Sequence, residues 1–375
     1  MKKVYIGMDV HKEKTVIAIA FSGTDEAIHY GKCSSDAVRL VSALRKLLKK
    51  YELTKKDVRI CYEAGPCGFA LARHLLRLDF DVEIIAPSLI PSKKGDRIKT
   101  DKRDARKLAR LFRAGELTAV HIPDSSDEVI RDLCRARTDA VDDSVRNRQR
   151  LLSFLLRNGH HYTGRSHWTE KHLRYLRELV LIDPVQKLIL EEYLLAVDSG
   201  FNRVQGLEDH IRNKLEAWSR RPFVEALQGM KGFQFVASMV VASELGDLTR
   251  FKHPRQLMGY LGLVPSESSS GTTRKQGSIT KCGNSHVRWM LVEIASSYRY
   301  APKVSKELSV RQEGLSGPIK EVSWRAQKRL NKRYVRLTMR KLHHNKVKVA
   351  IARELCSFIW ELAQVMSKQS ELKAA

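Results

Sequence analysis

The chain has 375 residues, enough for about two or three domains, and carries 68 Lys/Arg against 42 Asp/Glu, a formal net charge of +26. This excess of positive charge extends along the whole sequence and favours a polyanionic partner, nucleic acid before a membrane surface. The sequence has no run of about 18 apolar residues, so no membrane span is expected, and the short apolar stretch near Met1 is interrupted by Asp9, which is typical of a buried strand and not of a signal peptide.

The first third of the chain predicts a mixed α/β domain. Three short apolar runs, Val4–Val10, Thr15–Phe21 and Ala27–Tyr30, are separated by polar turns and indicate an antiparallel meander. The elements expected after them are a helix over Ala37–Lys50, a strand over Val58–Tyr62, a helix over Phe69–Leu78, a strand over Val82–Ile85 and a helix that begins at Asp101. The expected order is therefore β-β-β-α-β-α-β-α.

Four acidic residues occupy distinctive positions in this order. Asp9 lies on the first strand, Glu63 ends the fourth, and Asp101 and Asp104 open the last helix. Asp101 and Asp104 also form an ordinary capping arrangement at a helix start, and Asp9 and Glu63 are also ordinary residues for the end of a strand. An acid on an apolar strand such as YIGMDV is nevertheless hard to explain structurally. The order and the positions resemble the ribonuclease-H-like nuclease fold, in which four such carboxylates can hold Mg²⁺ ions for phosphodiester chemistry.

The middle of the chain, from Asp127 to about Arg220, is charged and helix-forming, with apolar positions at intervals of three and four residues. This pattern predicts an extended helical hairpin or coiled coil with Gly159–Ser166 near its tip, and a compact helical bundle is the alternative. In either case the region is expected to connect the flanking domains and to dimerise.

A second domain is expected to start near Pro222. Its segment Leu227–Gly246 resembles a helix-hairpin-helix unit, a module that meets DNA backbone through turn amides, although Gln234 stands where a second turn glycine is common. The following segment, Leu261–Arg288, mixes serines and glycines with basic residues. A flexible basic loop of this kind suits phosphate handling and could present a serine nucleophile, and a polar surface loop is the alternative.

Two sets of motifs carry a resemblance that covers nearly the whole chain. The first set is YIGMDVHKEK, YEAG and KTDKRDA, and the second is GYLGLVPSESSSG and GSITKCGNSHVR. Together they resemble the insertion-sequence transposases in which a DEDD, Holliday-junction-resolvase-like domain precedes a serine-bearing transposase domain. Members of this family act as recombinases guided by a bridge RNA.

The resemblance implies roles for individual residues. Asp9, Glu63, Asp101 and Asp104 match the DEDD tetrad and would be both catalytic residues and Mg²⁺ ligands. The serine before glycine in the second set is Ser270, the expected nucleophile, with Ser269 and Ser268 as alternatives in the triple serine. Four basic residues of the same segment are candidates for nucleic-acid binding: Arg274, Lys275, Lys281 and Arg288.

The expected protein is a DNA transposase that cuts and rejoins DNA through a serine–DNA intermediate, with Mg²⁺ as cofactor. Its expected partners are donor and target DNA, a guide RNA and further copies of itself in a homodimer or tetramer. The rivals are a metal-only junction endonuclease and a non-catalytic nucleic-acid-binding protein. The six cysteines form no C-x-x-C pair, which indicates reduced thiols of a cytoplasmic protein and no zinc site.

The expected division has four parts: a ribonuclease-H-like domain (1–120), a helical linker (121–221), a mainly helical serine transposase domain (222–300) and a basic helical C-terminal region (301–375). Within the last part, Lys303–Lys348 contains 14 Lys/Arg against 3 acids but no motif that assigns it to a ligand.

Overall fold

The structure is a computed structural model, and it describes residues 3–91, 100–270 and 273–374. The chain forms two compact units, one of residues 1–124 with 281–283 and the other of residues 125–280 and 284–375. Each unit is a body with its own core. The finer division into four parts stays a prediction.

The first unit is built around a six-stranded sheet with the strand order β3-β2-β1-β4-β5-β6. Its strands are β1 (Val4–Val10), β2 (Lys14–Phe21), β3 (Ile28–Ser34), β4 (Val58–Glu63), β5 (Asp81–Ile85) and β6 (Ala119–Val120). The first three strands are antiparallel neighbours, whereas β1, β4 and β5 run parallel. The expected meander and the expected order of strands and helices are confirmed. The short β6, which pairs antiparallel with β5, was not expected because two residues carry no periodic signal.

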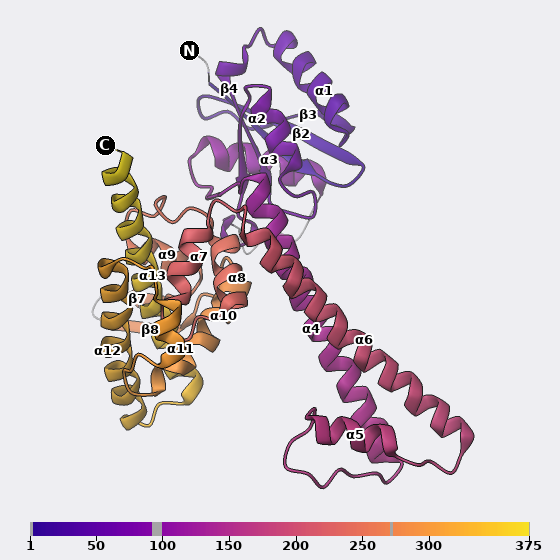
Figure 1. Cartoon of the computed structure of the whole chain (residues 1–375). Coiled ribbons are helices and arrows are strands. Elements are labelled where there is room, and N and C mark those ends of the chain that lie inside the picture. The colour runs from indigo at the N-terminus through magenta and orange to yellow at the C-terminus, as the bar shows by residue number, and fades with distance from the viewer. Residues whose placement is uncertain (1–2, 92–99, 271–272, 375) are drawn as a thin grey trace. The chain divides into compact units, whose positions relative to one another are not determined.

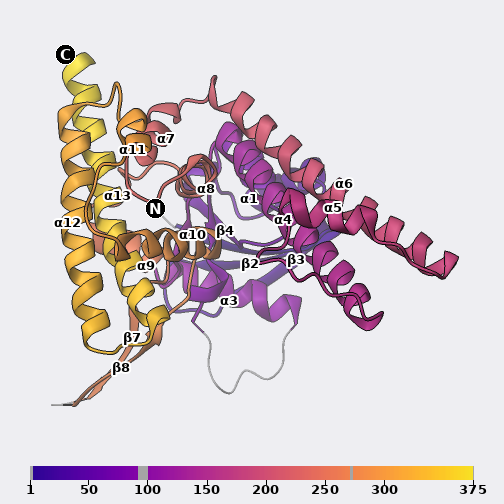
Figure 2. The ribbon, with the colours of Figure 1, turned by 60° about the horizontal axis from the view of Figure 1, so that its bottom comes forward.

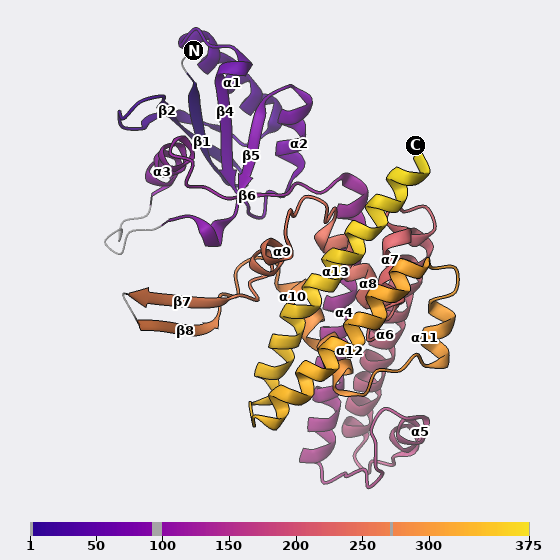
Figure 3. The same ribbon diagram turned by 90° about the vertical axis from the view of Figure 1, so that its left-hand side faces the viewer.

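Helices cover both faces of this sheet (Figure 3). Helices α1 (Ala37–Lys50) and α2 (Ala70–Arg77) bury leucines against one face, where the core includes Ile6, Met8 and Ile60. Helix α3 (Asp101–Arg113) packs on the other face, where Leu108 and Phe112 contact Cys61 and Ile85, and where its contacts with β2 are made by small residues: Val16, Ala18, Ala20, Ala105 and Ala109. Small residues let the axis of α3 approach the strands closely, which is consistent with a ribonuclease-H-like domain.

The second unit begins with a long helical hairpin. Helices α4 (Ser125–Arg157) and α6 (Pro184–Leu215) lie side by side, and α5 (Glu170–Glu178) closes the far end of the hairpin (Figure 1). A separate apolar cluster, which includes Leu151, Phe154 and Leu176, holds that far end together.

The remaining helices of the second unit pack around one large apolar core. They are α7 (Arg221–Gln228), α8 (Phe235–Leu245), α9 (Pro254–Tyr260), α10 (Ser285–Ala295), α11 (Lys306–Arg311), α12 (Gly317–Met339) and α13 (His344–Ala374). The segment Leu227–Gly246, expected to be a helix-hairpin-helix unit, contains only the last two residues of α7 together with all of α8, so the hairpin assignment stays a prediction. Every residue from Ala237 to Leu245 on α8 is buried. None of the helices that the structure describes combines the length and the apolarity that a membrane crossing requires.

The serine-rich segment is not the loop that was expected. Strands β7 (Pro265–Ser270) and β8 (Thr273–Ile279) pair antiparallel and form a hairpin that extends away from the helices of the second unit (Figures 2 and 3). The prediction of a flexible loop was wrong because strands are found in sequence through alternation of apolar and polar residues. Here nearly all side chains of β7 are polar and exposed on both faces, so this alternation is absent.

Candidate active site

The carboxylate site lies at the edge of the sheet where β1 and β4 end. Asp9 is near the end of β1, and the parallel register pairs Met8 with Tyr62, so Glu63 follows at the neighbouring position of β4. Because Met8 and Tyr62 point into the core shared with α1 and α2, side-chain alternation directs Asp9 and Glu63 to the opposite face. That face is covered by α3, which begins at Asp101.

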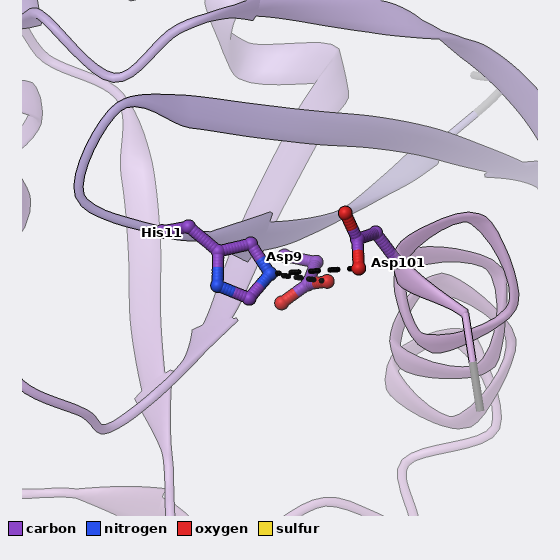
Figure 4. A group of neighbouring side chains, drawn as sticks. All are labelled: Asp9, His11 and Asp101. Carbon is purple, nitrogen blue, oxygen red and sulfur yellow. Dashed lines mark hydrogen bonds and ion pairs between the residues drawn. The ribbon is translucent and has the colours of Figure 1, made fainter.

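Three potential metal-ligating side chains converge at this edge (Figure 4). Asp9, His11 and Asp101 each offer a ligand atom, and these atoms all lie within 4.8 Å of one another. The Nε2 atom of His11 is 3.1 Å from Asp9 Oδ2, to which it donates a hydrogen bond, and 3.8 Å from Asp101 Oδ1. The Nζ atom of Lys14 is 2.8 Å from Asp101 Oδ2. Two carboxylates are therefore held beside two basic side chains of the β1–β2 turn region.

The electrostatics of the two carboxylates differ. Burial raises the pKa of Asp9, and the charges of Asp101 and Asp104 raise it further, while His11 opposes the shift. The hydrogen bond from Lys14 lowers the pKa of Asp101 and raises that of Lys14. A bound cation would favour the ionised form of Asp9, because its charge would oppose both the effect of burial and the smaller effects of Asp101 and Asp104.

The four predicted acids are brought to one edge of one sheet, but not into a single group. Asp9 and Asp101 are members of the convergent group, whereas Glu63 is exposed and lies outside it. Asp104 lies one helical turn beyond Asp101, near enough to influence Asp9 electrostatically. His11 and Lys14 were missed by sequence reasoning. The only signal in the sequence was that His11 follows Asp9 by two residues at the end of a strand.

The predicted nucleophile lies at the outer end of the serine hairpin. Ser270 is the last residue of β7 and is exposed, and its neighbour Gly271 lies outside the described residues. Alternation along β7 puts Ser269 on the face opposite to Ser270, together with Glu267. The Ser269 hydroxyl donates to Glu267 Oε1 at 2.9 Å. The two adjacent serines therefore have different surroundings.

The four predicted phosphate-binding residues are distributed over the hairpin and the segment after it. Lys275 is exposed on β8, where it pairs with Ser268, and Arg274 also lies on β8, although its side chain is outside the described part of the structure. Lys281 belongs to the first unit by its contacts. Arg288 on α10 donates from Nη1 to the Leu261 carbonyl at 2.9 Å, so it supports the backbone where the hairpin segment begins.

The chain is similar to transposases over both units. Residues 224–308 match a family described as "Transposase IS116/IS110/IS902 family", and residues 6–158 match the DEDD transposase domain of IS110 elements. The chain is 42% identical, over 97% of its length and 89% of the relative's, to a Sinorhizobium fredii protein provisionally named transposase y4qE. It is 29% identical, over 89% of its length and 96% of the relative's, to the transposase for insertion sequence element IS1533 of Leptospira borgpetersenii.

The fold, the carboxylate edge and these matches together define a DNA transposase of the DEDD type, an enzyme that acts on DNA with the use of a divalent metal ion. The chain belongs to the IS110/IS116 family of insertion-sequence transposases. The domain at residues 224–308 is thereby assigned to this transposase family and is not a serine recombinase.

Proposed function

We propose that this transposase moves its element by breaking and rejoining DNA phosphodiesters, and that Asp9, Glu63, Asp101 and Asp104 hold the divalent cations for this chemistry. One observation carries the proposal. The carboxylates of Asp9 and Asp101, with the imidazole of His11, converge within 4.8 Å at the edge of the sheet.

The donor set fits a hard divalent cation, for which carboxylate oxygens are the preferred ligands, and Mg²⁺ is the ion we propose. Asp9 and Asp101 would hold the ion directly, with Glu63 and Asp104 at the adjoining positions. When bound, such an ion stabilises negative charge on the attacking and leaving oxygens of a phosphodiester. Lys14 would orient the Asp101 carboxylate through its contact with Oδ2 and leave Oδ1, which lies 3.8 Å from His11 Nε2, for the ion.

Ser270 is the proposed nucleophile for strand cleavage. Its Oγ would form a bond to phosphorus as it loses its proton, and the bond from phosphorus to one deoxyribose oxygen would break, with that oxygen leaving as a hydroxyl. Attack of a DNA hydroxyl on the resulting phosphoserine diester would reverse these changes and join the new strands. Lys275 is exposed on the hairpin and would offset phosphate charge during the attack.

The proposed partners are donor and target DNA, with sequence readout delegated to base pairing with a bound RNA. Delegation of this kind leaves the protein to recognise backbone and shape, which agrees with a net charge of +26 and an aromatic content of 7%. We propose that the active form contains two or four copies of the chain.

A metal-only endonuclease is the second candidate, and one observation favours it. Among the described residues, the convergent group of Asp9, His11 and Asp101 lies within the first unit and includes no residue of the serine hairpin. In this alternative, the hairpin would bind phosphate and form no bond to it.

Covalent trapping on a labelled element end, with Mg²⁺ and the guide RNA supplied, separates the two candidates. We expect wild-type protein to form an adduct on the peptide that contains Ser268–Ser270, and Ser270→Ala to form none. Ser269→Ala is the matched control, because it removes the adjacent hydroxyl. Cleavage without any adduct would establish the metal-only endonuclease. An adduct that survives in Ser270→Ala and is lost in Ser269→Ala would move the nucleophile by one residue.

The metal proposal is tested in the same assay with Asp9→Asn and Asp101→Asn. Each change keeps the side-chain shape and removes a charged ligand, so we expect strand cleavage to fall by more than about a hundredfold. Glu26→Gln, which changes an exposed acid of the same unit, is the control. Cleavage at the wild-type rate in both Asn variants would exclude the metal site.

A further inference from the structure

Helix α12 presents two different sides. One side is buried in the core of the second unit through residues that include Ile319, Val322, Ala326 and Leu330. The opposite side carries five residues spaced by four, four, three and four positions, which align along one side of a helix. These residues, called the α12 face below, are Trp324, Lys328, Lys332, Val335 and Met339.

The three apolar members of the α12 face are exposed to solvent. Trp324 and Val335 are each 38% exposed, and Met339 is 77% exposed. The Nζ atom of Lys328 lies 5.7 Å from the centroid of the Trp324 ring, where an ammonium group is attracted by the π electrons. An exposed indole beside an ammonium group offers a stacking surface and a charge to the same ligand.

The charges of α12 are divided between its sides. Helices α12 and α13 lie side by side (Figure 2). Arg325 pairs with Glu361 of α13, and Arg329 and Arg333 both pair with Glu354 of α13, so these arginines help to hold the two helices together. Within the described part of the chain, neither Lys328 nor Lys332 has an acid within ion-pair distance. Glu321 also lies on this side and is 3.7 Å from Arg325. The α12 face therefore retains unneutralised positive charge.

A second exposed aromatic ring is fixed beside the same helix. Tyr300 is 58% exposed, and the guanidinium carbon of Arg299 lies 4.5 Å from its ring centroid. Asn331 of α12 donates from Nδ2 to the carbonyl oxygens of Tyr298 and Tyr300, each at 3.0 Å. Lys231 donates to the Tyr300 carbonyl at 3.1 Å. The backbone at Tyr300 is thus held against α12, near the α12 face.

We propose that the α12 face and Tyr300 bind single-stranded nucleic acid, with unpaired bases stacked on Trp324 and Tyr300 and phosphates at Lys328 and Lys332. Proteins that hold single strands combine a cationic track with aromatic platforms, because every base has a π face. Trp324 and Met339 are 15 residues apart, which corresponds to about 22 Å of helix, or about six nucleotides at about 3.4 Å each. A duplex hides its base faces and would gain from the lysines alone. The inference rests on the proposed function, in which single strands arise from the cut DNA or from the guide RNA.

Fluorescence anisotropy with 12-nucleotide oligo(dT), oligo(U) and a duplex of the same length tests the proposal on the full-length protein. We expect Trp324→Ala to weaken single-strand binding by about 5- to 150-fold, the range for loss of one base–aromatic stack. Trp324→Phe should restore most of the affinity, and duplex binding should stay unchanged. A stronger effect on oligo(U) would identify RNA as the ligand, and a stronger effect on oligo(dT) would identify DNA.

The proposed phosphate contacts of Lys328 and Lys332 are tested by the salt dependence of binding. Lys328→Gln with Lys332→Gln should reduce the slope of log affinity against log salt by about 1.4 for single strands, or about 0.7 per lost phosphate contact. Lys171→Gln with Lys187→Gln, which removes two exposed lysines from α5 and α6, is the charge-matched control and should change the slope by less than half as much. Equal slopes in the two double variants would overturn the phosphate assignment.

Two results for Trp324→Ala would overturn the proposal that bases stack on Trp324. One is wild-type affinity for both single-stranded oligonucleotides, and the other is a loss of affinity for the duplex as large as the loss for single strands. If Trp324→Ala does not fold, the test uses quenching of tryptophan emission by oligo(dT) or oligo(U). This quenching should be smaller in Trp324→Phe than in the wild type. Equal quenching in the two proteins would overturn the proposal. The single-strand proposal and the metal-site proposal can be refuted independently. Wild-type oligonucleotide binding by Trp324→Ala would not bear on the metal site, and wild-type cleavage by Asp9→Asn would not bear on oligonucleotide binding.

Discussion

Gly7 on β1 lies directly against the backbone of Ala109 on α3. A Cβ atom added to Gly7 would come within 2.4 Å of the Ala109 nitrogen and 2.5 Å of the Ala105 carbonyl oxygen. Two backbones can approach this closely only where no side chain separates them. Since α3 begins at Asp101 and β1 carries Asp9, this contact controls the separation of the two carboxylates.

We expect Gly7→Ala to destabilise the first unit by about 1–3 kcal/mol, the usual cost of overpacking, and to reduce strand cleavage by moving α3. Urea unfolding and the cleavage assay measure the two effects. Gly31→Ala on β3 is the control, because a Cβ atom there meets nothing within 4 Å and should alter stability by less than about 0.5 kcal/mol. Equal stability of the two variants would refute the close-packing argument.

His11 should contribute to metal selectivity. Imidazole is a good ligand for Ni²⁺, whereas Mg²⁺ prefers oxygen ligands. We therefore expect His11→Ala to weaken Ni²⁺ binding by about tenfold or more while changing Mg²⁺ binding much less. Isothermal titration calorimetry with each ion measures this. The same change in affinity for both ions would show that His11 acts only through its hydrogen bond to Asp9.

Glu244 should be critical for the stability of the second unit. Its carboxylate is 1% exposed and accepts hydrogen bonds from Arg135 at 2.7 and 3.0 Å and from Asn284 at 2.7 Å. Asn284 is also the N-cap of α10. Glu244→Ala removes a buried charged acceptor from Asn284 and from Arg135, whose side chain is 41% exposed and can be solvated after the change. We therefore expect the free energy of unfolding to fall by about 1.5–3 kcal/mol, the range for hydrogen bonds to a charged group.

Chemical denaturation tests this prediction against an exposed pair between α4 and α6, Asp143 with Arg203, at 43% and 58% exposure. Asp143→Ala should cost much less, because solvent screens that pair. Equal losses in the two variants would contradict the role assigned to burial. Replacing both Arg135 and Glu244 with methionine should recover part of the loss, since no charge is then left unpaired.

Mild acid should loosen the far end of the helical hairpin. His172 is fully buried, and its Nδ1 accepts a hydrogen bond from the Trp168 backbone at 3.0 Å. Burial, assisted by His167, lowers the pKa of His172 from its ordinary 6.5. The unfolded chain therefore binds the proton more readily than the folded chain. The stability that the neutral imidazole of His172 contributes is therefore fully present above pH 6.5. It is lost as the pH falls below 6.5 toward the pKa of His172 in the folded chain.

Thermal unfolding followed between pH 8 and pH 5 measures this effect. His172→Asn keeps an acceptor for the Trp168 N–H and does not titrate, so its melting temperature should fall less with acid than that of the wild type. His161→Gln, an exposed neighbour in the same region, should retain the wild-type pH dependence. Parallel pH profiles for wild type and His172→Asn would exclude His172 as the source.

The sheet and its helices were largely predictable because their apolar residues recur with the periods of strands and helices. The ranges Val4–Val10 and Ala37–Lys50 were predicted with the same bounds that β1 and α1 have in the structure. The serine hairpin was missed because its strands are polar on both faces. Pairing between β7 and β8 depends on backbone hydrogen bonds, which leave no periodic pattern in the side chains.

The sequence by itself determined the class of the protein and the candidates for its chemistry, because motif spacing and net charge are properties of the chain. Only the tertiary structure decided which candidates meet. It brought His11 and Lys14 to Asp9 and Asp101, and it separated the arginines of α12 that pair with α13 from the lysines that face outward. The physical reason is that distances between side chains depend on strand register and on the close packing of α3 over Gly7. Both arise from contacts between residues far apart in the chain.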